Sequence, residues 1–250
     1  MRFAAMLTRA NTLVVVPALN EELSIGEIIE HLHRERFTVL VINDGSTDQT
    51  SLVAKHHGAL IIDLPYNMGV GGALRVGFQV AIERGYEAVV QVDADGQHPV
   101  SSIQNLLDEA NSSGAHLVVG SRFITDGTTM DVGLVRRMVM KYLARSASRA
   151  TGVKITDSSS GFRLIRNPLL EQFSRSFSAN YLGDTYEALV SAGRAGYMVR
   201  EIPAAMMPRK VGVSSASLIQ SVQFTLKGVA VSVLRLLPHI ERLDRHVGPR

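Results

Sequence analysis

The stretch VVQVDADGQHP, from Val89 to Pro99, joins a strongly apolar run to two aspartates that stand one residue apart. A β-branched, apolar run without polar alternation is typical of a strand buried on both faces, as in a parallel sheet. Asp93 and Asp95 follow this run, and ligands of such sheets bind beyond the carboxyl ends of the strands. The stretch therefore predicts a parallel sheet and the edge at which its ligand binds.

Strand and helix patterns alternate outward from this stretch through the first half of the chain. The predicted strands are Thr12–Ala18, Phe37–Asp44, Ala59–Pro65, Glu87–Asp93 and Ala115–Ser121. The predicted helices between them are Glu21–His33, Thr47–His57, Val70–Arg84 and Val100–Asn111. This alternation predicts an α/β fold in which helices cover both faces of a parallel sheet.

The second half of the chain is less regular. It predicts helices at Val135–Ala150, Pro168–Phe177, Asp184–Ala195 and Leu218–Leu236, a strand near Tyr197–Ile202, and loops at Ser112–Gly114 and Thr125–Gly133. No segment has the composition of a linker between independent domains. We therefore expect a single domain over residues 1–213, followed by a C-terminal helix and basic tail over residues 214–250.

Composition excludes several classes of protein. The 250 residues are 46% hydrophobic and 20% charged, as in an ordinary soluble globular protein. A formal net charge of +3 is too small to indicate a nucleic-acid partner. The chain has no cysteine, which excludes disulfides and thiolate metal sites and agrees with a cytoplasmic location.

The segment Ser217–Pro238 is the one candidate for a membrane-spanning helix. A spanning helix needs about 20 mostly apolar residues, and this segment contains Gln220, Gln223, Lys227 and Arg235. An amphipathic helix that docks on the protein or on a membrane face fits it better. Basic residues outnumber acidic ones from Arg209 onward, which suits either an anionic membrane surface or a solvated tail.

The two aspartates at the end of the fourth predicted strand suggest a metal site. If the extended geometry persists, Asp93 and Asp95 project to one side, where two carboxylates repel each other unless a cation lies between them. Hard oxygen ligands suit Mg²⁺ or Mn²⁺. Gln97 would add a neutral oxygen, and His98 is either a softer ligand or a surface residue. The alternative for the whole pair is a solvated turn.

Two further strand ends carry polar residues. Asp44 terminates the second predicted strand and is a candidate acceptor of hydrogen bonds from a ribose or a base. Thr47 or Asp48 is a candidate cap of the next helix. At the end of the first strand, Asn20 is a candidate helix cap, and Glu21 favours the positive end of that helix.

Six motifs in this order resemble the family 2 inverting glycosyltransferases of the GT-A fold: VVVPALNEE, VINDGSTDQT, NMGVGGALRVGF, VDADGQHP, GSR and DSSSGFRLIR. Within that family the chain is most similar to the dolichol- or polyprenyl-phosphate sugar synthases, because DADGQHP resembles their metal-site pattern. The resemblance covers about Thr12 to Ser215. It implies a Rossmann-like GT-A sheet, mostly parallel and flanked by helices, with a C-terminal amphipathic helix.

The resemblance also implies a binding site for a nucleotide sugar and a divalent metal. The implied nucleotide-sugar-binding residues are Pro17, Leu19, Glu21, Ile42, Asp44, Asp93, Ala94, Asp95, Arg122, Arg136 and Arg209. Mg²⁺ or Mn²⁺ would be held by Asp93, Asp95 and Gln97. Residues 123–133 would form a flap over the donor and acceptor. Leu19 stands where an aromatic side chain is common in the family.

The implied catalytic residues are Asp95, Arg122 and Asp184. The reaction would displace a nucleoside diphosphate from the anomeric carbon, with the metal neutralising the leaving group and Arg122 and Arg209 adding fixed positive charge. A phosphate acceptor needs little or no base, whereas a hydroxyl acceptor needs one. Asp184 is similar in place to the family's catalytic acidic residue, and it is equally a helix N-terminal aspartate that favours the dipole.

A basic row marks the helix predicted after residue 134. It comprises Arg136, Arg137, Lys141, Arg145 and Arg149. Arg137, Lys141 and Arg145 are spaced four apart and therefore share a helix face. This face either follows a lipid phosphate or a membrane, or is simply solvated.

The expected function is metal-dependent transfer of a sugar from a UDP- or GDP-sugar to a polyprenyl or dolichyl phosphate at the cytoplasmic face of a membrane. The expected partners are the donor and the lipid phosphate, without nucleic acid, and a homo-oligomer stays open. One alternative is a glycosyltransferase with a soluble or polysaccharide hydroxyl acceptor. A nucleotidyltransferase of the same fold would need a basic glycine loop where this chain has PALNEE. A non-catalytic nucleotide-sugar binding protein is the alternative from another class.

Overall fold

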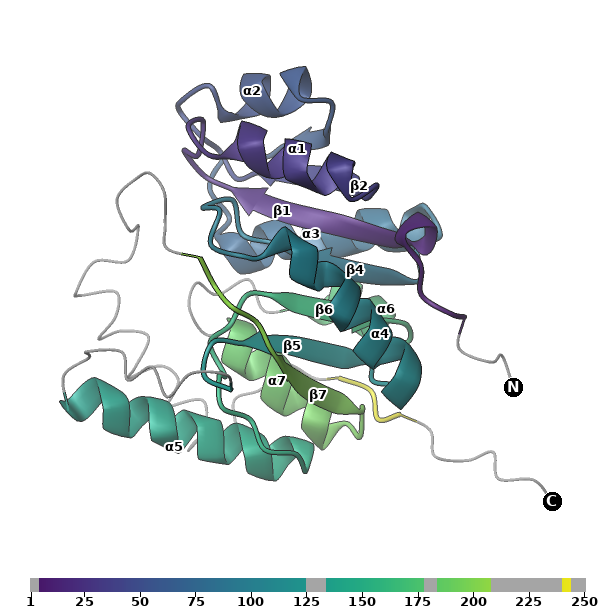
Figure 1. The fold of residues 1–250 in the computed structure, drawn as a ribbon, viewed down its shortest axis with the longest axis vertical. Coiled ribbons are helices and arrows are strands. Elements are labelled where there is room, and N and C mark those ends of the chain that lie inside the picture. Colours follow the sequence, from purple (N-terminus) through teal and green to yellow (C-terminus); the bar gives the residue numbers. More distant parts are fainter. Residues whose placement is uncertain (1–4, 125–133, 178–183, 208–239, 244–250) are drawn as a thin grey trace.

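The computed structural model describes residues 5–124, 134–177, 184–207 and 240–243, with residues 134–136 and 184 described by their backbone alone. Its strands form one sheet in the order β3-β2-β1-β4-β6-β5-β7 (Figure 1). The strands are β1 Thr12–Ala18, β2 Thr38–Asn43, β3 Leu60–Asp63, β4 Ala88–Gln91, β5 Leu117–Ser121, β6 Arg163–Arg166 and β7 Val199–Pro203.

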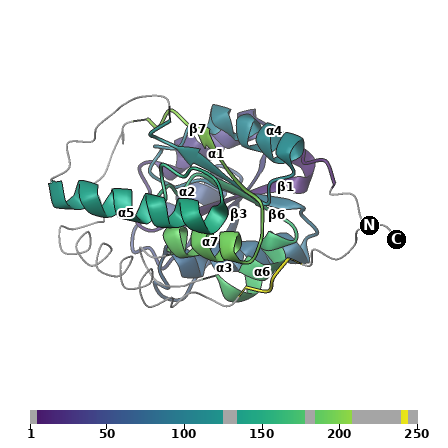
Figure 2. The ribbon, with the colours of Figure 1, turned by 90° about the horizontal axis from the view of Figure 1, so that it is seen from below.

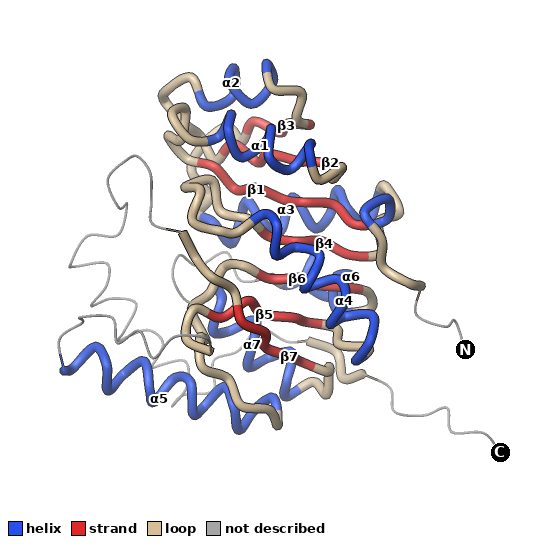
Figure 3. The backbone as a smooth tube through the Cα atoms, in the orientation of Figure 1, coloured by secondary structure: helices blue, strands red, loops and turns tan. Residues whose placement is uncertain are grey.

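Helices lie on both faces of this sheet, as the tube in Figure 3 and the view from below in Figure 2 show. The helices are α1 Ile25–Arg34, α2 Thr50–His56, α3 Val70–Glu83, α4 Ile103–Ser113, α5 Leu134–Thr151, α6 Leu169–Ser176 and α7 Asp184–Arg194, with 3-10 turns at Arg9–Asn11 and Val100–Ser102. Buried residues of α1, α2 and α4 share one apolar cluster, and those of α3, α5, α6 and α7 share the other. The fold is therefore a three-layer α/β sandwich.

The alternation of side chains along β1 explains why the run is apolar throughout. Leu13 and Val15 belong to the cluster on one face, while Val14 and Val16 belong to the cluster on the other. Because both faces are covered, each position of β1 is buried. β1 pairs in parallel with β2 and β4, so it is a central strand, and the carboxyl ends of these strands meet at one edge.

The six strands predicted from the sequence are confirmed, with ends that differ by a few residues. β6 was not predicted, and it lies antiparallel between β4 and β5. Its four residues, RLIR, begin and end with arginine and do not resemble a buried strand, yet Arg163 and Arg166 are both buried. The sheet is thus mostly parallel, as expected, with one antiparallel strand.

One predicted loop is partly wrong, and other predictions fall outside the described residues. Ser112 and Ser113 belong to α4, which ends because Gly114 adopts a left-handed conformation (φ 71°). The predicted loop Thr125–Gly133 and helix Leu218–Leu236 lie outside the described part of the chain, so the division into residues 1–213 and 214–250 stays a prediction. Within the described ranges, no helix combines the length and apolar character that crossing a bilayer requires.

Candidate functional site

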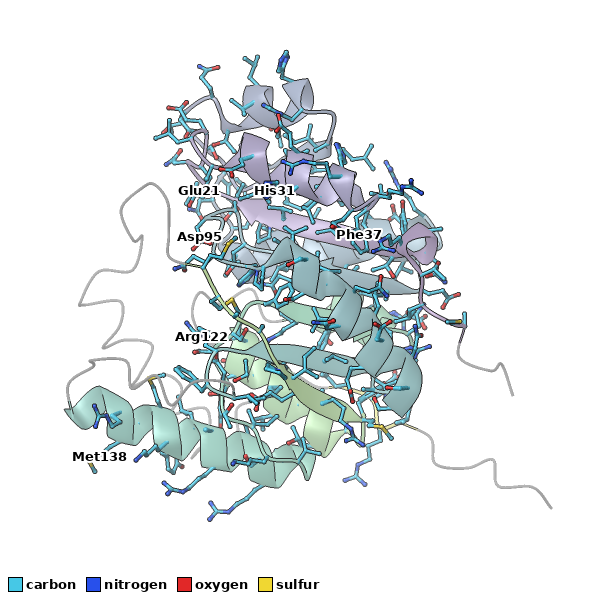
Figure 4. All side chains as sticks on the ribbon, in the orientation of Figure 1. Glu21, His31, Phe37, Asp95, Arg122 and Met138 are labelled. Atoms are coloured by element: carbon cyan, nitrogen blue, oxygen red, sulfur yellow. The ribbon has the colours of Figure 1, made fainter. Side chains whose placement is uncertain are left out.

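The loops that follow β1, β4 and β5 lie at one edge of the sheet, where these strands end. Figure 4 shows Glu21, Asp95 and Arg122 along this edge, although their positions in the chain are far apart. Each residue follows a different strand. The parallel arrangement of these strands therefore gathers the polar loops that the sequence places after them.

The loops after β1 and β2 are tied together by side chains. The Asn20 side-chain oxygen accepts a hydrogen bond from the Thr47 amide at 2.8 Å, and the Asn20 amide donates to the Ser46 hydroxyl at 2.9 Å. Asn20 therefore does not cap α1, which begins only at Ile25. The prediction of an Asn20 cap is wrong because the residue adopts a left-handed φ of 55° and bonds across to the neighbouring loop.

Asp48 and Glu21 extend this connection between the two loops. The Asp48 carboxylate accepts the Thr50 amide at 3.0 Å, at the first residue of α2. It also accepts the Glu22 amide at 3.2 Å. The Glu21 amide donates to the Thr50 hydroxyl at 2.8 Å. The prediction that Thr47 or Asp48 caps α2 is wrong, because Gln49 stands at the N-cap and makes no side-chain cap hydrogen bond, while Asp48 connects the two loops.

Three predicted nucleotide-binding residues are buried beneath the edge. Pro17 and Ile42 are register partners in β1 and β2, and Ala94 is buried in the turn after β4. Leu19, by contrast, is exposed at the end of β1. The structure thus places Leu19 where a ligand could contact it, and the other three where they support the backbone.

Asp44 is buried at the end of β2, with 4% of its surface exposed. Its carboxylate accepts the Met68 amide at 2.7 Å, which ties β2 to the segment before α3. Burial raises the pKa of Asp44, and the hydrogen bonds from the Met68 and Gly69 amides only partly offset this rise. Asp44 therefore carries a carboxylate that its surroundings do not fully compensate.

Asp93 is held by His98, which lies five residues further on. The Asp93 amide donates to His98 Nδ1 at 2.9 Å, and His98 Nε2 lies 3.4 Å from Asp93 Oδ2. His98 is only 6% exposed and packs against the Phe162 ring. The expectation of a surface histidine is therefore wrong, and both ring nitrogens face Asp93.

The extended geometry assumed for the two aspartates does not persist beyond β4. The strand ends at Gln91, and residues 94–95 form a turn in which the Asp95 carboxylate accepts the Gln97 amide at 3.0 Å. Gly96 permits the turn with a φ of 75°. The strand argument for placing Asp93 and Asp95 on one side is consequently wrong, although both remain at the same edge.

A small open pocket lies beside Asp93. Its lining consists of Asp93, Gln97, His98, Arg122, Ser159, Ser160, Gly161 and Met206. No group of three acidic, histidine or cysteine side chains suited to a metal occurs in the described residues. Asp93 and Gln97 nevertheless supply hard oxygen donors in an open site, which fits Mg²⁺ or Mn²⁺ that takes its other ligands from phosphate and water.

Arg122 is fixed in this pocket by Asp157. Its Nε and Nη2 donate to the two Asp157 carboxylate oxygens at 2.7 and 2.9 Å, and Nη2 also donates to the Ser159 hydroxyl at 2.9 Å. Burial would raise the pKa of Asp157, but the hydrogen bonds and charge of Arg122 lower it below its usual value. This bidentate pair holds a guanidinium in place with little freedom.

The negative charge of Asp93 also affects the pKa of Arg122. Burial would lower the pKa of Arg122, whereas the hydrogen bond and charge of Asp157, together with the charge of Asp93, raise it. Arg122 is therefore a permanent positive charge in the same pocket as the Asp93 carboxylate. Such a pair suits a ligand that brings both a cation and phosphate oxygens.

Glu201 on β7 holds the segment that carries Asp157. Its carboxylate accepts the Thr156 amide, the Thr156 hydroxyl at 2.9 Å and the Asp157 amide at 2.8 Å. Burial raises the pKa of Glu201, partly offset by these hydrogen bonds. Sequence reasoning missed Asp157, Ser159 and Glu201. The motif DSSSGFRLIR was a signal for the first two, and nothing local marks Glu201.

Gly161 lets the backbone approach Asp93. A Cβ atom at this position would lie 2.9 Å from Asp93 Oδ2 and 3.0 Å from Gln91 Nε2, which is closer than real contacts allow. Only glycine fits without displacing one of these side chains. The wall of the pocket is therefore set by the glycine of the same motif.

Arg163 joins this wall to the start of α7. Its Nε donates to the Ser160 carbonyl and its Nη1 donates to the Thr185 carbonyl, both at 2.6 Å. Asp184 is the first residue of α7, but its side chain lies outside the described atoms, as does that of Arg136. Arg209 lies outside the described residues altogether. The roles predicted for these three residues stay predictions.

Comparison with known proteins gives one family and several relatives. Residues 13–173 match the family model described as Glycosyl transferase family 2. Polyprenol monophosphomannose synthase of Mycolicibacterium smegmatis is 33% identical over 217 residues, which are 82% of this chain and 81% of that protein. Undecaprenyl-phosphate mannosyltransferase of Micrococcus luteus is 26% identical, over 82% of this chain and 87% of that protein.

Solved structures agree in fold. Glucosyl-3-phosphoglycerate synthase from Mycobacterium tuberculosis, in complex with Mn²⁺, uridine diphosphate and phosphoglyceric acid, has a TM-score of 0.67 at 20% identity. The match covers 92% of this chain and 80% of that chain. At this identity the likeness concerns the fold alone.

Proposed function

Since the chain belongs to glycosyl transferase family 2, we propose that it transfers a sugar from a nucleoside-diphosphate donor to a polyprenyl-type lipid phosphate. The names of two relatives, a polyprenol monophosphomannose synthase and an undecaprenyl-phosphate mannosyltransferase, support the acceptor. The observation that carries the proposal is the pocket in which Asp93 and Gln97 face the fixed cation of Arg122. This combination suits a donor diphosphate.

The donor base and ribose would lie over the ends of β1 and β2. Leu19 is exposed there, and Asp44 offers a carboxylate whose charge is not fully compensated. A ribose hydroxyl or a base N–H would donate to this carboxylate. Glu21 lies at the same edge and completes the group (Figure 4). Pro17, Ile42 and Ala94 would support this surface from below.

Asp93 and Gln97, with Asp95 in the same turn, would hold the Mg²⁺ or Mn²⁺. When bound, the metal supplies positive charge that neutralises the leaving diphosphate. Arg122 adds a second positive charge at this pocket, and Asp157 keeps the guanidinium oriented. His98 keeps the Asp93 backbone and carboxylate in position through its two ring nitrogens.

The acceptor oxygen would attack the anomeric carbon as the bond to the diphosphate breaks, with inversion of configuration. A phosphate acceptor already carries the negative charge that this attack requires, so the site needs no strong base. A hydroxyl acceptor would need one, and Asp184 at the start of α7 is the candidate. Arg163 fixes this helix start relative to the pocket wall.

A soluble acceptor is the second candidate. It is favoured by the structural likeness to a synthase solved with phosphoglyceric acid. The two candidates differ in whether the product stays with the lipid phase. They can be separated in one assay.

The test incubates the protein with Mn²⁺ or Mg²⁺, a panel of UDP- and GDP-sugars, and either polyprenyl phosphate or a soluble acceptor. We expect a lipid-linked sugar with one donor, loss of product on chelation, and loss in Asp93→Asn. Asp108→Asn is the matched control, because Asp108 lies on the exposed side of α4. Transfer to the soluble acceptor alone would refute the lipid acceptor, and transfer with all metal chelated would refute the metal role.

A further inference from the structure

α5 presents a basic row on its outer side. Arg137, Lys141, Arg145 and Arg149 are all exposed and follow one another at intervals of four residues. A helix turns by about 100° per residue, so each step of four advances the row by about 40°. The whole row therefore occupies one side of the helix. Met138, which is 63% exposed, and Tyr142, which is 41% exposed, lie on that side too.

The opposite side of α5 fixes how the helix is rotated. Leu143 and Ala147 are buried in the core cluster that includes α7. The Tyr186 hydroxyl on α7 donates to Ser146 on α5 at 2.8 Å. Because these contacts turn one side of α5 toward the protein, the basic row lies on the side that faces outward. Figure 4 shows Met138 pointing away from the body of the molecule.

The charge of this row has no compensation within the described residues. α5 contains no aspartate or glutamate. None of the four basic side chains forms a salt bridge with an acid in the described part of the chain. Elsewhere Lys55 and Arg175 pair with nearby carboxylates. The row therefore projects positive charge into solvent over a helix of about 27 Å.

We propose that the outer side of α5 docks on the surface of an anionic phospholipid bilayer, an inference that rests on the lipid acceptor of the proposed function. Arginine and lysine side chains can reach lipid phosphates while a neighbouring apolar side chain enters the interface. Met138 and Tyr142 have the place and character for that entry. A nucleic acid would bind the basic side chains but would leave the apolar Met138 without a contact. The net charge of +3 is also small for a protein with such a partner.

The position of α5 in the molecule agrees with docking on a bilayer. The helix extends past the sheet on the side where the strands have their carboxyl ends (Figure 1). Met138 and Arg122 lie on this side of the molecule in Figure 4. A bilayer against α5 would therefore bring a lipid phosphate to the catalytic edge while its hydrocarbon chain stays in the membrane.

The test measures flotation of the full chain with phosphatidylcholine vesicles that contain or lack phosphatidylglycerol, without donor or polyprenyl phosphate. We expect binding to the anionic vesicles alone, and loss of binding at high salt. The triple variant Lys141→Gln, Arg145→Gln, Arg149→Gln should bind at least about tenfold more weakly, because each cation contributes near such a surface. A second variant, Met138→Glu, should also weaken binding.

The matched control is Arg34→Gln, Arg84→Gln, Arg194→Gln, which removes three exposed cations from other helices or their ends. It should bind within about twofold of the unaltered protein, because these cations lie outside the docking surface. An equal loss of vesicle binding in both triple variants would show that binding depends on net charge alone, and it would overturn the proposal. So would unchanged binding of the α5 variant, or binding lost only in Lys227→Gln, Arg235→Gln. Tighter binding to single-stranded RNA than to anionic vesicles would also overturn it.

A transfer assay separates this inference from the proposed function. The α5 triple variant should retain transfer to a short-chain polyprenyl phosphate in detergent, since it leaves the pocket intact. If the unaltered protein transfers sugar to no lipid phosphate while the α5 variant still loses vesicle binding, the proposed function fails and the docking surface stands. If transfer occurs but vesicles do not bind, the docking surface alone fails.

Discussion

Asp44 and Asp157 are two buried aspartates with opposite electrostatics. Asp44 faces backbone amides, and its pKa is raised because burial outweighs them. Asp157 meets the guanidinium of Arg122, and its pKa is lowered although burial opposes this. One charge is compensated inside the protein and the other is not. The difference indicates that Asp157 serves the architecture of the pocket, whereas Asp44 is suited to a ligand.

The largest effect on stability and activity is expected from replacing Arg122, the cation that pairs with Asp157. Arg122→Gln leaves the buried Asp157 carboxylate without its counter-charge, so the free energy of unfolding should fall by about 3 kcal/mol. Transfer should fall about a hundredfold, because the pocket loses a fixed positive charge. Urea unfolding and steady-state kinetics measure the two effects.

Arg175→Gln is the control for that variant, because it breaks an exposed pair with Glu171 on α6. It should cost less than about 1 kcal/mol. Equal stability losses in Arg122→Gln and Arg175→Gln would contradict the view that Asp157 depends on Arg122.

Replacing Asp157 or Asp44 by asparagine tests the separate roles of the two carboxylates. Asp157→Asn should lower the free energy of unfolding by about 2 kcal/mol, since it weakens charge-assisted hydrogen bonds. Asp44→Asn keeps an oxygen for the Met68 amide and should leave stability unchanged or slightly raised. It should instead weaken nucleotide binding about tenfold, as expected for a lost bond to a charged acceptor.

Calorimetric titration with UDP and GDP, together with urea unfolding, checks both asparagine variants. A large loss of stability in Asp44→Asn, with unchanged nucleotide affinity, would reverse the roles assigned to the two residues.

Gly161→Ala tests the close approach of the Gly161 backbone to Asp93 in the pocket wall. The added methyl group meets Asp93 and Gln91, so we expect a stability loss of about 1 kcal/mol from overpacking. The apparent affinity for Mn²⁺ should weaken because Asp93 must move. Ser159→Ala, in the same loop, removes the hydroxyl that bonds to Arg122 and Asp157 without adding bulk, and it serves as the control. Unchanged Mn²⁺ affinity in Gly161→Ala would refute the role of this close approach.

The smallest effect is expected in the dependence of stability on pH. The raised pKa of Asp44 means that the folded state takes up this proton first, so its contribution to stability improves as pH falls through that raised value. Asp157 behaves oppositely, and its contribution is lost as pH falls through its lowered value. Any stability advantage of Asp44→Asn should therefore shrink as the pH falls through the raised pKa of Asp44. A growing advantage on acidification would contradict this assignment.

The sequence was sufficient to place Asp44 and Asp93 close behind buried strands. Both strands consist mainly of apolar residues, so the pattern alone locates the strand ends to within a few residues. The conformation beyond the strand was not predictable in the same way. Asp95 turns back on Gln97, and Asn20 bonds to Thr47 in another loop, which local propensity does not specify.

The part of the site that contains Asp157 was largely missed, because its contacts join distant parts of the chain. Asp157 meets Arg122 across 35 residues, and Glu201 meets the Asp157 amide across 44. β6 was missed for a related reason, since the buried Arg163 and Arg166 donate hydrogen bonds to carbonyls in other parts of the chain. Apolar periodicity does not record such pairings.

The antiparallel β6 also affects how the protein acquires its structure. The pairings of β1 with β2 and of β2 with β3 join strands that follow one another in the chain, so this part can form from comparatively local contacts. β4 and β5 do not pair with each other, because β6 separates them. The strands that precede Asp93 and Arg122 therefore join only after residue 166 has emerged from the ribosome. On a growing chain the part that contains Asp44 would be assembled early, and the complete pocket would be among the last parts to form.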